Sequence, residues 1–122
     1  MSNTTMHQIL HGAQLNLARF DLVSIRLVVL CQETGSLSEA ARIAHMSKSN
    51  ASQRLASLES SVRQQLFVRD YRGLRPTPAG RVFATHGRTI LEELGALNSQ
   101  MLNLSMDLPH ELSLRKNLFD TR

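Results

Sequence analysis

Hydrogen-bonding side chains are concentrated in a short stretch that begins at Ser47, and their chemistry suits contacts with nucleic acid. The candidates for reading base edges are Lys48, Ser49, Ser52 and Gln53. They fall in the first turns of an expected helix, and a recognition helix contacts bases in the major groove mainly from that end. Ser47 and Asn50 are candidates for phosphate contacts at the same end. Each useful base contact would contribute about 1–3 kcal/mol of discrimination.

Two short helices joined by a tight turn would position these side chains. Ser36 with Glu39 three residues later predicts a capping box, which satisfies two free backbone donors at the start of the first helix. His45 and Met46 form the turn, and Ser47 is a good N-cap for the second helix. The buried face of the second helix is predicted by the spacing of Ala51, Leu55, Leu58 and Val62.

An earlier helix should form the third wall of the core. We expect it to run from Leu22 to Thr34, with Asp21 as its N-cap and Gly35 after its end. Its predicted apolar stripe comprises Leu22, Ile25, Val28, Val29 and Gln32. Cys31 is the single cysteine, so the chain cannot form an intramolecular disulfide, and we interpret this residue as a small core side chain.

The sequence changes character after Val62 and predicts a β-hairpin wing. Residues 66–69 have strand propensity, residues 70–73 form a turn, and residues 74–76 return as a short edge strand. Arg72 lies near the expected tip, where it could reach a minor groove or its phosphates. We make no claim for Tyr71, which could stack or simply cover the turn.

The arginines form the second group of candidate nucleic-acid contacts. The candidates for phosphate or wing contacts are Arg54, Arg69, Arg72 and Arg75. In the alternative interpretation, Arg69 or Arg75 pairs with Asp70 or Glu59 at the surface. Residues 42–88 carry nine basic and two acidic side chains, a local charge of +7, whereas the formal charge of the whole chain is +4. Phosphate neutralisation requires this concentration of charge, although a charge run alone is usually a solvated surface.

A long helix is predicted to begin at Thr77, an N-cap followed by Pro78 at the first helical position. Apolar residues with heptad spacing follow, and the candidates for dimerisation are Phe83, Ile90, Leu94, Leu97, Met101 and Leu104. Gly87 and Gly95 each weaken the helix by about 1 kcal/mol relative to Ala, so we expect a partner helix to stabilise it. Packing back on the same domain could explain Val82 and Phe83, but hardly a row that continues to Leu108.

The ordered spacing of these motifs resembles the LysR-type transcriptional regulators. The resemblance covers about residues 20–105 and rests on Asp21-Leu22, Gly35-Ser36-Leu37, Ala40-Ala41, Ser47, Ser52, Leu58-Glu59, Leu66-Phe67, Arg69 and Thr77-Pro78-Ala79-Gly80. It implies a recognition helix from Ser47, a wing over residues 66–76 and a linker helix from Pro78, through which members of the family dimerise. The N-terminal domain of molybdate-responsive regulators is similar over the same helices.

Departures from the family pattern limit what this resemblance implies. Lys48 and Ser49 stand where the family often has Gln and Pro, and Gln53 stands where it often has Arg, so a typical family operator is not expected. Arg63 replaces the glycine usual before the wing and would need a left-handed conformation. The resemblance also implies a longer chain with an effector-binding domain, whereas this sequence ends at Arg122, so we expect that domain to be absent.

We therefore expect a mainly α protein, a winged helix-turn-helix of three helices and a two-stranded β wing followed by a long dimerisation helix. Residues 1–19 would be a flexible extension, 20–76 the DNA-binding domain, 77–108 the linker helix and 109–122 a tail. The expected function is sequence-specific binding of double-stranded DNA by a dimeric, or higher oligomeric, transcriptional regulator. The alternative is a short interaction protein that pairs through its linker helix with a full-length regulator and modulates it.

Other classes of function find little support in the sequence. There is no phosphate-binding loop, ordered Cys/His ligand set or Ser/His/acid constellation, so we expect no enzyme activity, cofactor or metal. His7 and His11 are four residues apart, but without ordered partners they are interpreted as incidental. Residues 1–19 fit neither a signal peptide nor a membrane span. A cytoplasmic protein that binds no membrane and no small-molecule effector is expected.

Overall fold

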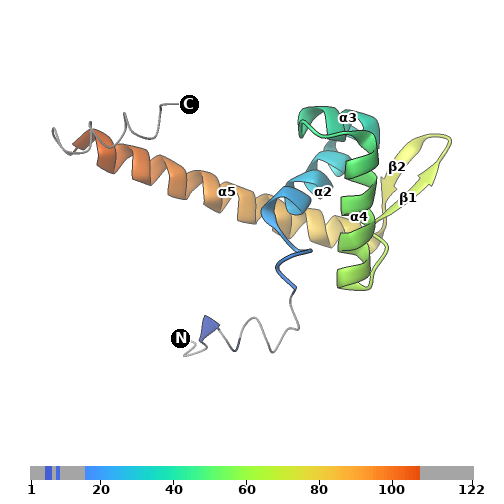
Figure 1. Ribbon diagram of the computed structural model, residues 1–122, viewed down its shortest axis with the longest axis horizontal. Helices are drawn as coiled ribbons and strands as arrows, with labels where there is room; N and C mark the ends of the chain where they lie inside the picture. Colours follow the sequence, from blue (N-terminus) through green and yellow to red (C-terminus); the bar gives the residue numbers. More distant parts are fainter. Residues whose placement is uncertain (1–4, 7, 9–15, 108–122) are drawn as a thin grey trace. The chain divides into compact units, whose positions relative to one another are not determined.

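Four helices and a two-stranded antiparallel sheet make up the part of the chain that the computed structural model describes, residues 5–6, 8 and 16–107 (Figure 1). The elements are α2 (Leu22–Thr34), α3 (Leu37–Ile43), α4 (Lys48–Val62), β1 (Phe67–Asp70), β2 (Gly73–Pro76) and α5 (Pro78–Asp107). The chain divides into one unit that ends at Arg88 and a second that begins at Thr89, and α5 contributes to both. The predicted mainly α fold with a β wing is confirmed. Most of the expected N-terminal extension and the whole tail from residue 109 lie outside the described residues.

The predicted helix starts at Asp21, Ser47 and Thr77 are confirmed. The side chain of each accepts a hydrogen bond from the backbone N–H three residues later, at 2.8, 3.0 and 3.0 Å respectively. These bonds satisfy donors that the first turn of a helix leaves without a backbone partner. Local side-chain chemistry therefore fixes where α2, α4 and α5 begin.

The capping box predicted at the start of α3 is only half formed. Ser36 Oγ accepts from the Glu39 N–H at 3.1 Å, as expected. The Glu39 carboxylate does not return this bond but pairs with the Arg42 guanidinium, and the Ser36 N–H donates to Thr34 Oγ1 at 3.2 Å. An arginine one turn along the helix is a stronger partner for a carboxylate than a neutral amide is.

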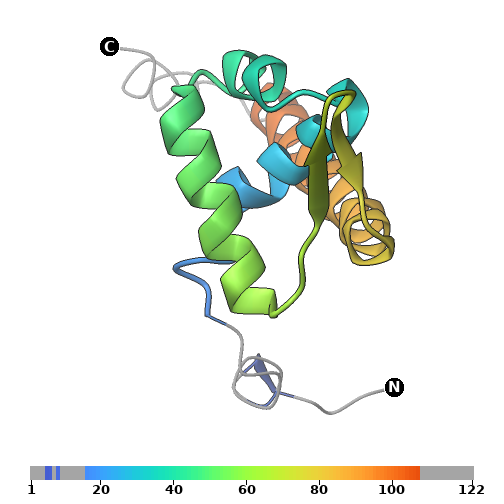
Figure 2. The same cartoon turned by 90° about the vertical axis from the view of Figure 1, so that its right-hand side faces the viewer.

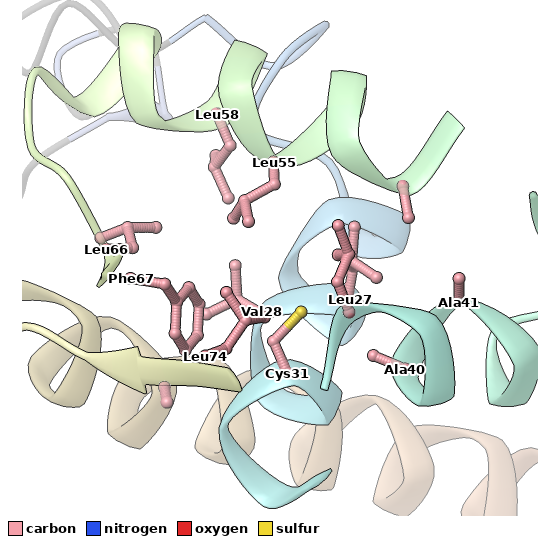
Figure 3. Packing of buried hydrophobic residues seen from close by; sticks show 13 residues of the cluster. Leu27, Val28, Cys31, Ala40, Ala41, Leu55, Leu58, Leu66, Phe67 and Leu74 are labelled. Atoms are coloured by element: carbon pink, nitrogen blue, oxygen red, sulfur yellow. The ribbon is translucent and has the colours of Figure 1, made fainter. Parts of the chain in front are cut away.

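The core lies in the first unit and collects side chains from every element around α2. Figure 3 shows them pointing toward one another: Leu27, Val28 and Cys31 from α2, Ala40 and Ala41 from α3, Leu55 and Leu58 from α4, Leu66, Phe67 and Leu74 from the hairpin region. Figure 2 shows α2 between α4 and the hairpin, and α2 contacts α3, α4 and β2. The buried face predicted for α4 is confirmed, with Val62 partly buried at its end.

The stripe predicted for α2 is wrong at one end. Leu22 is 43% exposed, whereas Leu27, which the stripe omitted, is fully buried. The stripe assumed one apolar face, but α2 is covered on several sides and buries Ser24 and Cys31 as well. A helix surrounded by neighbours has no single stripe from which its burial can be predicted.

The Leu66 peptide joins α4, the hairpin and α5. Its N–H donates to the Glu59 carboxylate at 2.7 Å, and the Phe67 N–H donates to the same oxygen at 3.3 Å. Its carbonyl accepts from the Thr77 N–H at 2.9 Å. The hairpin that follows pairs Phe67 with Pro76 and Asp70 with Gly73. Both strands of the wing are therefore anchored at their base.

Within the first unit, the N-terminal part of α5 packs closely on neighbouring segments, because two of its residues are glycines. A Cβ at Gly80 would lie 2.0 Å from the Leu66 carbonyl oxygen, and one at Gly87 would lie 3.1 Å from Ile25 Cγ2. Gly87 is thus buried against α2, which gives a packing reason for a glycine in the heptad row. Phe83 is partly buried on the core, and its ring centroid lies 5.4 Å from that of Phe20. The expected alternative, packing on the same domain, therefore applies to Phe83 but is wrong for Val82, which is 61% exposed.

We predict that Gly80→Ala destabilises the protein. The added methyl would collide with the Leu66 carbonyl oxygen, and overpacking of this kind costs about 1–3 kcal/mol in the free energy of unfolding. Urea unfolding of the full chain, followed by circular dichroism, measures the change.

Gly95→Ala is the matched control on the same helix. A Cβ at Gly95 meets nothing within 4 Å, so this variant should gain up to about 1 kcal/mol from helix propensity alone. Equal effects of the two substitutions would contradict the steric role of Gly80.

Candidate nucleic-acid interface

A tight turn between α3 and α4 sets the direction of the second helix. The Met46 N–H donates to the Ala41 carbonyl at 3.0 Å, and the His45 N–H donates to the Arg42 carbonyl at 3.1 Å. His45 has a φ of 58°, a left-handed conformation that is uncommon for a residue with a Cβ. Ser47 then returns to extended backbone, with φ −68° and ψ 153°, and caps α4. The predicted helix-turn-helix is confirmed.

The first turns of α4 present the predicted reading residues at the surface. Lys48, Ser49 and Gln53 are exposed, and Ser52 is half-buried. Ala51, on the opposite face, is fully buried in the core and holds this end of the helix in place. Since Asn50 supplies the N–H that Ser47 caps, both phosphate candidates at this end also take part in the helix cap.

Arg54 is held by other protein groups. Its Nη1 lies 3.3 Å from Asp21 Oδ2 and 3.5 Å from Ser24 Oγ, which ties α4 to the start of α2. Burial raises the pKa of Asp21, but hydrogen bonds from Ser24 and the charge of Arg54 outweigh it, and the net pKa lies below its usual value of 3.8. One carboxylate thus caps α2, as predicted, and also pairs with Arg54 of α4, a second role that the sequence analysis did not predict for Asp21.

Asp70 organises the tip of the wing. Its Oδ1 accepts from the Arg72 backbone N–H at 2.8 Å, and its Oδ2 lies 2.6 Å from Arg75 Nη2 and 3.5 Å from Arg72 Nη2. The backbone N–H of Arg72 is the main cause of the lowered pKa of Asp70, and the charges of Arg75 and Arg72 add to it. The expected alternative, a pair between Arg75 and Asp70, is confirmed. The bond from the Arg72 N–H could have been predicted, because an Asp in a turn often accepts from the backbone N–H two residues later.

Tyr71 stands beside these charges and is 94% exposed. The Arg72 guanidinium carbon lies 5.5 Å from the centroid of its ring, within the range of a cation–π contact. The tip therefore presents a cation next to an aromatic ring.

Arg69 makes a different contact from the one considered in the sequence analysis. Its Nη2 donates to Ser52 Oγ at 3.3 Å, a bond between the wing and the reading helix. Arg69 also lines two hollows beside α4. The larger, about 390 Å³, is bordered by Glu59 and Phe67, and the smaller, about 200 Å³, by Lys48.

Within residues 5–6, 8 and 16–107, we looked for a metal centre and for a reactive cysteine. No cluster of three or more His, Cys, Asp or Glu side chains that could hold a metal occurs among the described residues. Cys31 is fully buried, as predicted for a core residue, and burial raises the pKa of its thiol to about 11. In the same part of the chain, no helix is long and apolar enough to cross a membrane.

Together, the capped helix pair, the β-hairpin and the cationic surface define a winged helix-turn-helix domain. Residues 22–81 match the family model described as bacterial regulatory helix-turn-helix protein, lysR family. Residues 22–81 therefore form a helix-turn-helix domain of the lysR family.

Relatives and solved structures agree with this assignment. The nitrogen assimilation regulatory protein nac of Klebsiella aerogenes is 34% identical over 94 residues, which are 77% of this chain and 31% of that protein. The iron-regulated virulence regulatory protein IrgB of Vibrio cholerae is 36% identical over 85 residues, which are 70% of this chain and 28% of that protein. The chain thus spans about a third of the length of these curated relatives.

Among solved structures, the complex of the CbnR DNA-binding domain with DNA superposes with a TM-score of 0.64 at 25% identity. The similarity covers 70% of this chain and 98% of that chain. A complex of the BenM DNA-binding domain with benA site 1 DNA, at 24% identity and a TM-score of 0.65, shares the fold. The similarity to BenM covers 70% of this chain and 96% of the BenM chain.

We predict that the contribution of Asp21 to stability depends on pH. Asp21→Ala should lower the free energy of unfolding at neutral pH by about 0.5–2 kcal/mol, the usual effect of losing an N-cap. Since the pKa of Asp21 is lower in the folded state than its ordinary 3.8, its stabilisation is present above that value and is lost as the pH falls through the folded pKa. Urea unfolding from neutral pH to about pH 2 measures the difference.

Asp21→Ser is the matched control, because its hydroxyl can cap α2 but carries no charge for Arg54. Its deficit relative to the wild type should be smaller than that of Asp21→Ala. A deficit of either variant that stays constant across the pH range would contradict a role of the ionised carboxylate.

Proposed function

We propose that this chain binds double-stranded DNA in a sequence-specific manner as part of a transcriptional regulator, with the first turns of α4 in the major groove. The observation that carries the proposal is the surface at the start of α4, where Lys48, Ser49 and Gln53 are exposed beside a buried Ala51. A helix anchored on one face and polar on the other can enter the groove without disturbing the core. Its N-terminal residues then meet the base edges.

The charge distribution supports the same function. The segment of residues 42–88, which includes the reading helix and the wing, carries a local charge of +7. Binding through neutralised phosphates releases counterions, so the affinity should fall steeply as salt is raised. At the wing tip, Arg72 is the best placed of the candidates to reach a minor groove, and Arg75 would contact the neighbouring backbone.

The relatives also support this proposal. The nac and IrgB proteins are named as regulatory proteins, and the CbnR domain was solved bound to DNA. The comparisons give no support to the alternative of a short protein that acts by pairing with a full-length regulator.

The proposal is tested by selecting bound duplexes from a random DNA library at near-physiological salt. We expect an enriched interrupted inverted repeat, since two recognition helices related by a dimer axis read two half-sites. Retention of duplexes without any enriched sequence would leave only non-specific electrostatic binding and would refute sequence-specific recognition.

Two substitutions separate base reading from phosphate binding. Gln53→Ala should reduce discrimination at one base pair of the selected site by about 1–3 kcal/mol, because Gln can form two hydrogen bonds to a base edge. Arg72→Ala should instead weaken binding to all sequences and reduce the salt slope by about 1. Competition binding at several salt concentrations distinguishes these effects. A uniform loss of affinity in Gln53→Ala would contradict its base-reading role.

We further propose that the chain forms a homodimer through α5. Within the second unit, Ile90, Leu94, Leu97, Met101 and Leu104 repeat at heptad spacing and are 41–53% exposed. A helix with a sustained apolar row is typical of a coiled-coil partner. Phe83 is the exception among the candidates, because it packs on the core of its own unit.

Charge placed in this row should dissociate the dimer. In Leu97→Lys with Met101→Lys, each ammonium would be buried without a partner, which should weaken dimerisation by at least about tenfold per substitution. Asn98→Lys adds the same charge at an exposed polar position outside the row and should leave the dimer intact. Sedimentation equilibrium measures the association. An unchanged dimer in the double variant would exclude this row as the interface.

A further inference from the structure

Arg69 and Arg75 lie on opposite faces of the β1–β2 hairpin. Side chains of a strand alternate between faces, so Arg69 lies on the same face as Phe67, whose ring is 3% exposed in the core. Arg75 is the cross-strand partner of Val68 and therefore lies on the opposite face, where it pairs with Asp70. Arg69 is thus directed over α4, whereas the other wing arginines are held by Asp70 at the tip.

The contact made by Arg69 is with a candidate base-reading residue. Its Nη2 donates to Ser52 Oγ at 3.3 Å. Ser52 is one turn after Lys48 and Ser49 on α4, so it shares their face. The bond therefore couples the wing to the reading face of the helix.

The chemistry of the serine hydroxyl gives this contact a consequence. A hydroxyl has one hydrogen to donate and two lone pairs that accept. A hydroxyl in a helix often donates to the carbonyl four residues earlier, as Thr34 and Thr85 do here at 2.8 and 2.9 Å. Ser52 Oγ accepts from Arg69, and among the described residues its hydroxyl makes no donor bond to a helix carbonyl. The contact therefore orients the side chain while the hydroxyl hydrogen remains for another partner.

We propose that Arg69 is a positioning residue for base readout, which acts through Ser52 and not through a phosphate. The inference rests on the proposed function. Because Arg69 is a cationic donor, its hydrogen bond polarises the Ser52 hydroxyl and makes it a better donor than acceptor. Ser52 therefore prefers a base acceptor, such as N7 or O6 of guanine, N7 of adenine or O4 of thymine. The amino groups of cytosine and adenine, which could use only its remaining lone pair next to a positive charge, are weaker partners. Arg69 thus determines specificity without contacting DNA.

The test is a double-mutant cycle on the full chain, using the duplex selected by the wild type and its single-base variants at several salt concentrations. Ser52→Ala and Arg69→Met should each lower discrimination at the same base position by about two- to tenfold, the range for one neutral hydrogen bond. The double variant should lose no more than either single variant, because the two residues act in series. The salt slope should stay unchanged in all three variants.

Arg69→Lys separates geometry from charge. Lys keeps the positive charge but lacks the planar guanidinium fork, so this variant should lose discrimination as Arg69→Met does. Arg72→Met is the control for removing a wing cation that does not contact Ser52, and it should weaken all duplexes and lower the salt slope. Thermal melting by circular dichroism shows that each variant compared is folded.

Two results would overturn the inference. If Arg69→Met weakens all duplexes equally and lowers the salt slope, while Arg69→Lys restores binding, Arg69 is a phosphate contact. If its effect persists undiminished in the Ser52→Ala background, it acts independently of Ser52. These outcomes leave the proposed function intact, since the wild type still selects a sequence. Failure of the wild type to enrich any sequence would refute the proposed function and this inference with it.

Discussion

The peptide at Leu66 is the constraint on which the rest of the first unit depends. It is the point where the end of α4, the base of the wing and the start of α5 meet, because Glu59 binds its N–H and Thr77 binds its carbonyl. A backbone group without a partner in the interior costs about 1–3 kcal/mol, so the three elements satisfy one another at this point. The close approach also explains Gly80, since a side chain there would displace the carbonyl. The position of the wing relative to the reading helix follows from this junction.

Local chemistry made much of the fold predictable from the sequence. Asp21, Ser47 and Thr77 cap helices because their side chains accept from a backbone N–H three residues later, a short-range interaction that spacing alone reveals. These caps depend on a few neighbouring residues, and no knowledge of the tertiary fold is needed to predict them. The left-handed conformation at Arg63 is also confirmed, with a φ of 56°, but that expectation came from the family resemblance.

Interactions between distant segments could not be predicted in the same way. Arg54 reaches Asp21 across 33 positions, and Arg69 reaches Ser52 across 17, so no spacing rule connects them. The prediction of the buried face of α2 was wrong for a related reason, because neighbouring elements cover more of this helix than one stripe. The sequence could identify cations and hydroxyls suited to DNA, but only the tertiary contacts show which of them the protein already uses.

These contacts indicate how readily each arginine could exchange its protein partner for a DNA phosphate. The pairs of Arg72 and Arg75 with Asp70 are at the surface, where an ion pair contributes little to stability, so exchange of the carboxylate for a DNA phosphate costs little. Arg54 is different, because its partner Asp21 also caps α2, and its Nε is buried without a hydrogen-bond partner among the described residues. Moving Arg54 toward DNA would disturb the start of α2 as well as the ion pair. Of these paired arginines, the two at the wing tip, and not Arg54, are therefore the ones that could bind a phosphate with little disturbance of the fold.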